Sequence, residues 1–250
     1  MHSSFFQFGQ LHIPVYGVFA AVGLMAALAL SQRTARLVRL DAGKVWDAAL
    51  TMVVAALVFS RVLLVAGSWH SFLEAPLLVL SLPSLNDTGV LMTAIFMVVY
   101  LRWKKLPLLG FLDAMGPCFA LVWAFLSLGE LVAGTRDGMP TQSLLAMKDD
   151  MLGKVQPVEL YTMLVAMVLC GVLLRWMPRR GAAGLGFGLW LVLTGGASCL
   201  LGFLRLPSEL YGTAMLDPAQ WIGLMMMIVG AALFLALPPV TAEKEANDAV

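Results

Sequence analysis

Three arginines lie within or at the ends of apolar runs, where a guanidinium can meet a phosphate group. Arg61 lies inside an otherwise apolar run, Arg136 follows a long apolar segment, and Arg205 ends another such segment. A guanidinium donates two parallel hydrogen bonds to phosphate, and an arginine beside lipid is a default candidate for a functional site. We expect these side chains to surround an anionic phospholipid headgroup. A structural ion pair, or separate anchoring at the interface, explains the same residues without a ligand.

Two acidic residues, Asp87 and Glu130, are candidates for a general base. Asp87 precedes a short apolar run, and Glu130 follows Gly129 close to the end of a long one. A carboxylate at such a border either accepts a proton from a substrate or is held in an ion pair, for example with Arg61. The residue types alone leave both interpretations open.

Tyr16, Gly134 and Gly138 complete the set of residues that we expect to bind substrate. Tyr16 lies near the start of the first apolar run, where its hydroxyl group either meets a ligand or anchors the chain at the interface. Gly134 and Gly138 flank the charged pair Arg136-Asp137, and glycine lets a ligand or another backbone approach closely. We expect one cavity to be lined by four residues: Tyr16, Arg61, Glu130 and Arg205.

The composition places this chemistry in a membrane. Of the 250 residues, 60% are hydrophobic and only 12% are charged, whereas a soluble domain carries about 25% charged residues. The net charge is +1, and no basic tract is dense enough to indicate a nucleic-acid partner. All three cysteines lie within apolar runs and are expected to be small buried side chains. We therefore expect neither a metal site nor a cofactor.

Seven apolar segments are predicted to cross the membrane as helices: residues 13–30, 48–66, 88–101, 108–133, 159–174, 185–204 and 219–237. The fold class is therefore an all-α integral membrane protein with one domain over residues 1–238 and a charged cytoplasmic tail over 239–250. The third segment is short enough to be a re-entrant piece instead. The stretch 112–138 opens with an acid and a Gly-Pro pair and ends in crowded charges and glycines, so we expect the chain to be organised around it.

Basic residues gather on one side of the predicted bundle. That side holds Arg33, Arg36, Arg39, Lys44, Arg102, Lys104, Lys105, Arg175, Arg179, Arg180 and Lys244. Because cytoplasmic loops carry the excess of lysine and arginine, the N-terminus is predicted to lie outside and the C-terminus in the cytoplasm. The longer loops at 68–87, 134–158 and 205–218 then share the outer side.

Five segments carry a family likeness in their order along the chain. They are LHIPVYGVFAAVGLM with Tyr16-Gly17, FSRVLLVAGSW with Arg61, RWKKLPLLGFLDAMGPCFAL, VQPVELYTML, and LDPAQWIGLMMMIVG with Gln220. Together they resemble prolipoprotein diacylglyceryl transferases, seven-span enzymes of the bacterial inner membrane. The resemblance implies that the cysteine thiol of a prolipoprotein signal peptide displaces glycerol phosphate from phosphatidylglycerol.

The chain departs from the family pattern at polar positions. The family histidine before the third span falls on Asn86 or Asp87. The family signature Gly-Arg-x-Gly-Asn-Phe-x-Asn-Gly-Glu becomes LSLGELVAGT, which puts Ser127 on the arginine and Glu130 on an asparagine. In the sixth span, the Tyr-Gly pair, the Arg and the Glu of the family fall on Thr194-Gly195, Ser198 and Gly202, while Arg205 is kept.

Two hypotheses follow from these departures. The first is an enzyme that transfers diacylglyceryl from phosphatidylglycerol to a lipoprotein cysteine, or carries out a related lipid-handling step, with an altered site. The second is a non-catalytic relative that acts as a lipid-binding or scaffold subunit beside other membrane proteins, since a fold does not determine a function.

Overall fold

The computed structural model describes residues 5–8, 11–69, 87–134, 138–143, 146–149, 153–177, 181–206 and 216–237. These residues form seven α-helices: α1 (Val15–Leu37), α2 (Ala42–Gly67), α5 (Asp87–Trp103), α6 (Leu108–Ala133), α7 (Val158–Trp176), α8 (Leu185–Gly202) and α9 (Pro218–Ala236). Six of them are long and apolar enough to cross a membrane, and α5 is shorter at 17 residues. The prediction of an all-α, multi-pass membrane protein is confirmed, and the seventh crossing and the orientation stay predictions.

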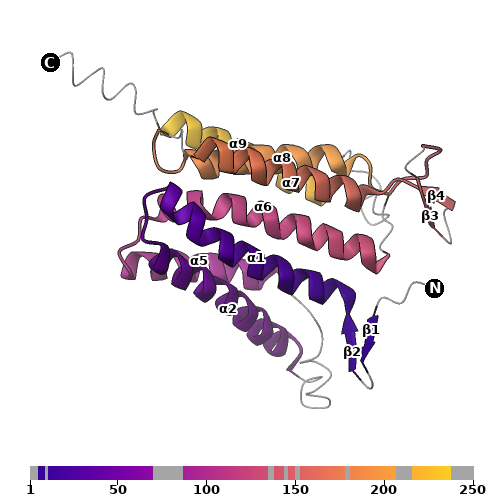
Figure 1. Ribbon diagram of the computed structural model, residues 1–250, viewed down its shortest axis with the longest axis horizontal. Coiled ribbons are helices and arrows are strands. Elements are labelled where there is room, and N and C mark those ends of the chain that lie inside the picture. Colours follow the sequence, from indigo (N-terminus) through magenta and orange to yellow (C-terminus); the bar gives the residue numbers. More distant parts are fainter. Residues whose placement is uncertain are drawn as a thin grey trace.

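Two short antiparallel hairpins lie at one end of the bundle (Figure 1). Strands β1 (Phe5–Phe8) and β2 (Leu11–Pro14) pair just before α1, and β3 (Met147–Asp149) pairs with β4 (Gly153–Val155) just before α7. Neither hairpin was predicted. At this end α1, α5, α7 and α9 begin and α2, α6 and α8 finish, so we call it the hairpin end and the opposite one the basic end.

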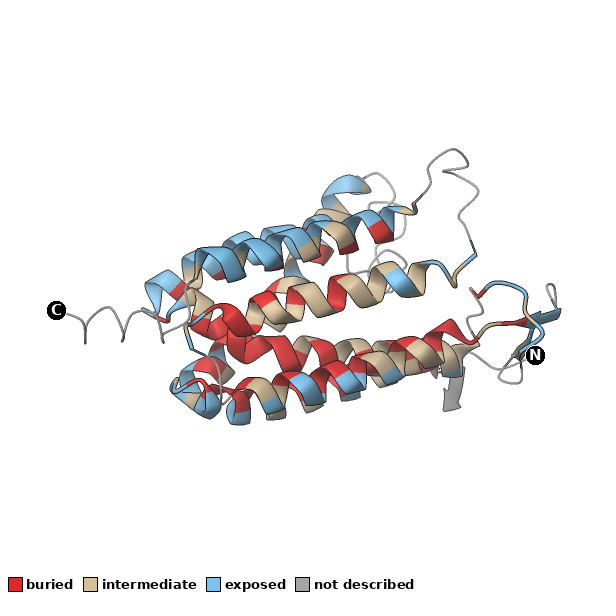
Figure 2. Cartoon of the chain, turned by 90° about the horizontal axis from the view of Figure 1, so that it is seen from above, coloured by how far each residue is buried: buried red, intermediate tan, exposed pale blue. Residues whose placement is uncertain are grey.

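Helix α6 lies at the centre of the bundle and organises the packing. It packs against α1, α7 and α8 and touches α5, while α2 packs on α1 and α5, so that α2 and α8 lie on opposite sides of the α1–α6 layer (Figure 1). In α6, 56% of an 18-residue stretch is buried, against 17% in α2 and in α9. Buried residues face the middle of the bundle, and the outward helix faces are exposed (Figure 2). A helix that is apolar all round belongs in such a centre.

A buried carboxylate joins α6 to the start of α8 at the basic end. Asp113 is 1% exposed, and its side chain accepts hydrogen bonds from the backbone N–H groups of Gly184 at 2.8 Å and Phe187 at 2.7 Å. The first N–H groups of a helix have no partner within the helix, and the positive end of the helix dipole favours an anion there. Asp113 therefore supplies from another helix the cap that α8 lacks in its own sequence.

Helices α8 and α9 meet along a seam of glycines that recur every seven residues. A Cβ atom on Gly223 would lie 2.7 Å from the carbonyl oxygen of Gly195, and one on Gly230 would lie 2.7 Å from that of Gly188. Small residues allow this close backbone approach, which is the usual way in which membrane helices associate in the absence of a hydrophobic driving force. The seam fixes the position of α9 beside α8, and both helices contribute residues to the cavity described below.

Candidate functional site

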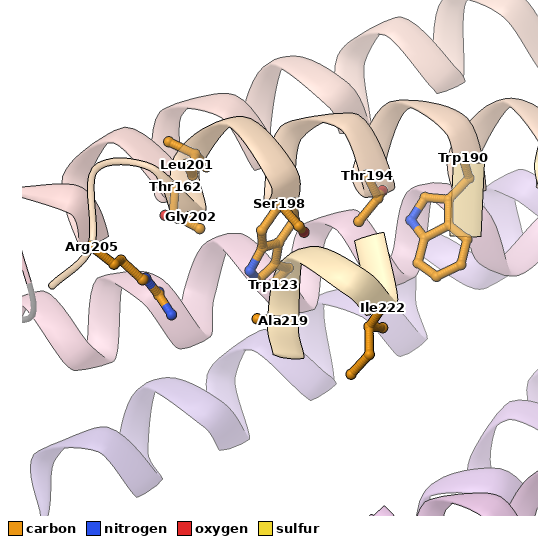
Figure 3. A pocket seen from close by; sticks show the side chains of 10 residues that line it. All are labelled: Trp123, Thr162, Trp190, Thr194, Ser198, Leu201, Gly202, Arg205, Ala219 and Ile222. Carbon is orange, nitrogen blue, oxygen red and sulfur yellow. The ribbon is translucent and has the colours of Figure 1, made fainter. Parts of the chain in front are cut away.

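A cavity of about 360 Å³ lies between α6, α7, α8 and α9 toward the hairpin end (Figure 3). It is lined by Trp123, Thr162, Trp190, Thr194, Ser198, Leu201, Gly202, Arg205, Ala219 and Ile222. Helix α8 forms one wall, because its residues 190, 194, 198 and 202 are four apart and share a helix face. The wall carries an indole and two hydroxyl groups, and the cation Arg205 lies just beyond its end.

Backbone hydrogen bonds between short extended segments hold Arg205 at the mouth of this cavity. Gly138 pairs with Arg205 as an antiparallel bridge, and Met139 donates its N–H to the carbonyl oxygen of Leu204 at 2.9 Å. On its other side, Met139 accepts from the N–H of Gln156 at 3.0 Å. Among the described residues the half-buried Arg205 side chain forms no ion pair, and it extends back along the bundle in the direction of Trp123 (Figure 3). A guanidinium in this position can receive an anion.

Two of the polar groups in the cavity have no hydrogen-bond partner. Within the part of the chain that the structure describes, the buried atoms Nε1 of Trp190 and Oγ1 of Thr194 are both unpaired. The hydroxyl group of Thr162, in contrast, donates to the carbonyl oxygen of Val158 at 2.8 Å. The cavity therefore offers hydrogen-bond donors that the fold itself does not use.

Glu159, in the first turn of α7, is a residue that the sequence analysis did not single out. It is 1% exposed, and neither carboxylate oxygen has a hydrogen-bond partner among the described residues. It stands three residues before Thr162, on the same face of α7. This three-residue spacing to a polar residue is the sequence feature that could have identified Glu159 as a site residue. An acid in the first turn of a helix, however, is ordinarily explained by its favourable interaction with the helix dipole.

Tyr16 and Glu130, two of the predicted site residues, lie near each other at the contact of α1 with α6. The ring of Tyr16 packs against Gly129, where an added Cβ atom would lie 3.3 Å from it, and Tyr16 interacts electrostatically with Glu130. Arg61 and Asp87 belong to a different pair of helices, α2 and α5, which pack closely where Ser60 meets Gly89. The Asp87 side chain lies outside what the structure describes.

The predicted glycines have backbone roles in this structure. Gly134 ends α6 in the left-handed conformation with φ 86°, which an L-residue adopts only with strain. Gly138 lies directly against the backbone of Gln156, where a side chain would collide. Their predicted contact with a substrate stays a prediction, and Arg136 lies outside the described residues.

The predicted site residues that the structure describes lie toward the hairpin end, in three separate places. Arg205 lines the cavity, whereas Tyr16, Arg61 and Glu130 do not. The four residues that we expected around one cavity therefore lie apart: Arg205 at the α6–α9 cavity, Tyr16 and Glu130 at the contact of α1 with α6, and Arg61 on α2. Sequence order and hydropathy predict how deep a residue lies in the membrane, but not which neighbouring helix it faces.

A second cavity, of about 570 Å³, lies on the other side of this layer between α1, α2, α5 and α6. Its lining is apolar apart from Thr93, whose hydroxyl group already donates to the carbonyl oxygen of Gly89 at 2.7 Å. This space has no free polar group among its described lining residues. Of these two cavities, the α6–α9 cavity is the one with polar groups available to a ligand.

Comparison with known proteins agrees with the resemblance noted in the sequence. The family model for prolipoprotein diacylglyceryl transferase matches residues 3–236. The chain belongs to the prolipoprotein diacylglyceryl transferase family. Three residues of the α8 wall, Thr194, Ser198 and Gly202, are those for which the resemblance described above implies Tyr, Arg and Glu in the family pattern.

Relatives from several bacteria are similar to the chain, each named phosphatidylglycerol–prolipoprotein diacylglyceryl transferase. The protein of Clostridium tetani is 22% identical over 243 residues, which cover 92% of this chain and 95% of the relative. The protein of Parasynechococcus marenigrum is 29% identical over 139 residues, 54% of this chain and 50% of the relative. That of Bordetella parapertussis is 29% identical over 159 residues, 60% of this chain and 61% of the relative. The chain thus spans about half the length of the Parasynechococcus relative.

Proposed function

We propose that this protein lies in the bacterial inner membrane and binds phosphatidylglycerol in its α6–α9 cavity. In this proposal it is a diacylglyceryl transferase-like member of its family. The observation that supports this most is the position of Arg205, a half-buried guanidinium at the mouth of a cavity with unused hydrogen-bond donors. A phosphate on Arg205 would receive charge-assisted hydrogen bonds, and the glycerol and acyl chains would extend along α8. Arg61 and Arg136 are proposed to assist at the surface of the outer leaflet.

The reaction proposed for this site is a displacement at the phosphate-bearing carbon of the diacylated glycerol of phosphatidylglycerol. The thiol of a lipoprotein signal-peptide cysteine loses its proton to a base, its sulfur forms a bond to that carbon, and the bond from carbon to phosphate oxygen breaks. Glycerol phosphate leaves with the electron pair, and Arg205 stabilises its charge. Asp87 and Glu130 are candidates for the base, and Glu159 joins them because it shares a helix face with the cavity residue Thr162.

A specific observation also favours the second hypothesis, a lipid-binding relative without turnover. The three family positions in the cavity wall carry the neutral residues Thr194, Ser198 and Gly202, and Arg205 is the one charged residue among its described lining residues. Losing one transition-state donor typically lowers a rate about 10²–10³-fold. We therefore expect binding of phosphatidylglycerol with slow transfer or none.

A transfer assay with phosphatidylglycerol and a lipobox peptide tests this proposal beside a family member that has the full signature. We expect a rate at least about 100-fold below the control, since several donors of one unit are replaced. A rate within about tenfold of the control would show that the replaced residues are not essential here. Failure to bind phosphatidylglycerol would contradict both hypotheses.

The orientation is also a proposal, with the N-terminus outside and residues 239–250 as a cytoplasmic tail of a domain that covers 1–238. Reporter fusions after Lys105 and after Arg180 are expected to report the cytoplasm, because the basic loops lie there. A periplasmic signal at either position would contradict this topology.

A further inference from the structure

The two unpaired donors in the cavity lie side by side and deep in its wall. Thr194 is 8% exposed, and the buried indole nitrogen of Trp190 lies on the side of the ring that faces Thr194 (Figure 3). The two residues are four apart on α8, so that they share a face one helical turn apart. Neither Nε1 nor Oγ1 has a partner within the described residues, and both atoms border the same cavity.

The free hydroxyl group of Thr194 is an exception among the buried threonines that the structure describes. Thr34, Thr93 and Thr162 each donate to a backbone carbonyl oxygen of their own helix, at 3.0, 2.7 and 2.8 Å. This bond is the ordinary solution for a threonine inside a helix, because it satisfies the hydroxyl group without any other element. Thr194 does not form it. Its hydroxyl group is therefore available for a partner that is not part of the described chain.

The chemistry of the pair specifies what that partner is. An indole N–H is a donor only, and a threonine hydroxyl group donates as well as accepts. Two donors that converge on one place fit an oxygen without hydrogen atoms, such as a carbonyl oxygen. A donor left unpaired in the apolar interior is unfavourable, so the pair gains most from an acceptor that itself belongs in the membrane.

The distance of Trp190 and Thr194 from Arg205 indicates which carbonyl oxygen the acceptor is. Thr194 lies eight residues before Gly202 on α8, about 12 Å along the helix. The Arg205 side chain points from the mouth toward this interval (Figure 3). An arginine side chain followed by a phosphate and a glycerol covers a distance of this order, and in a glycerophospholipid the ester carbonyl groups follow the glycerol toward the membrane centre.

We propose that Trp190 Nε1 and Thr194 Oγ1 donate hydrogen bonds to an ester carbonyl oxygen of the lipid whose phosphate lies on Arg205. This inference rests on the proposed function and adds that the cavity selects an ester-linked diacyl lipid over an ether-linked one. Trp190 and Thr194 act here as positioning residues: they fix how deep the glycerol lies, and thereby place its phosphate-bearing carbon near the mouth.

Binding of two synthetic phosphatidylglycerols, one with ester-linked and one with ether-linked chains of equal length, tests the proposal on the full-length protein in detergent. The ether lipid keeps the phosphate and the apolar chains but lacks both carbonyl oxygens. We expect the ester lipid to bind about tenfold more tightly, since a buried donor pair without its acceptor is unfavourable. Thr194→Val and Trp190→Phe should each weaken the ester preference, and the double variant should abolish it.

Two further variants separate this role from an effect on folding. Thr194→Ser keeps the hydroxyl group and should keep the preference. Thr162→Val changes a residue of the same cavity whose hydroxyl group is already bound to Val158, and it should keep the preference too. Equal binding of both lipids by the unmodified protein would overturn the inference and leave phosphatidylglycerol binding intact. The inference would also be overturned if the double variant still preferred the ester lipid. It would likewise be overturned if the variants weakened the binding of a lipobox peptide and left the binding of the lipid unchanged. Binding of neither lipid would overturn the proposed function along with it.

Discussion

Asp113 and Glu159 are both carboxylates that the fold encloses almost completely, at 1% exposure each, but their surroundings differ. Asp113, at the basic end, accepts two short hydrogen bonds from the backbone at the start of α8. Glu159, toward the hairpin end, has no hydrogen-bond partner for either oxygen among the described residues. The first arrangement is that of a structural group, because the carboxylate replaces a missing helix cap.

The difference shows where the bundle is built for stability and where it is left ready for a ligand. Burying a polar group without a partner is unfavourable, and such groups concentrate at functional sites. The unpaired atoms of Trp190 and Thr194 border the α6–α9 cavity, whereas the first N–H groups of α8 at the basic end are satisfied by Asp113. We interpret the α6–α9 region as the functional half of the molecule and the Asp113 cap as its anchor.

Replacing Asp113 should have the largest effect on stability. Asp113→Ala removes two hydrogen bonds to a charged acceptor, each of which contributes about 1.5–3 kcal/mol, and leaves two buried N–H groups unpaired. We expect a loss of about 3–5 kcal/mol, measured by unfolding in detergent. A change below about 1 kcal/mol would mean that α8 does not depend on this cap.

Replacing Glu159 should have the opposite effect. Glu159→Met keeps the length of the side chain and removes an unpaired buried carboxylate, so we expect the protein to be unchanged or more stable, by up to about 3 kcal/mol. The same variant should lower any transfer activity, as should Glu159→Gln. If Glu159→Met destabilises the protein as much as Asp113→Ala, Glu159 is a structural group and the comparison fails.

Much of this architecture can be predicted from the sequence, because hydropathy marks each helix independently. The predicted span 108–133 coincides with α6, and 48–66 lies inside α2, which extends to Ala42 because Asp41 caps it through the N–H groups of Gly43 and Lys44. The sequence also leads us to expect that the chain is organised around the stretch 112–138, and α6, which contains residues 112–133 of it, is the most buried of the six long apolar helices.

The site could be predicted only in part, because it depends on which helix faces which. Of the predicted site residues, Arg205 lines the α6–α9 cavity, and its role there stays a prediction. Trp190 and Glu159 were not singled out, because no local sequence feature shows that a buried indole or carboxylate lacks a hydrogen-bond partner. The hydrogen bond that the Gly184 N–H donates to Asp113 joins residues 71 positions apart, and local patterns do not reveal such a contact.

The smallest effect is expected at the basic end, in two turns of the same form. The N–H of Leu40 donates to Ala35 and that of Leu106 to Leu101, both at 2.9 Å, and the residues before them, Arg39 and Lys105, have φ of 60° and 54°. Glycine is the usual residue in this left-handed position. Replacing either Arg39 or Lys105 by glycine should stabilise the protein by about 0.5–1 kcal/mol and leave phosphatidylglycerol binding unchanged. Weaker lipid binding would show that the basic end also contributes to the site.

The affinity for phosphatidylglycerol after removal of one cation tests most directly that the α6–α9 cavity is the lipid site. Arg205→Ala should raise the dissociation constant about 10- to 100-fold, because a hydrogen bond to a charged group contributes about 1.5–3 kcal/mol. Arg175→Ala, which removes an exposed arginine from the last turn of α7 at the basic end, is the matched control and should leave the affinity within about twofold. Equal affinities of Arg205→Ala and the unmodified protein would show that the phosphate binds elsewhere.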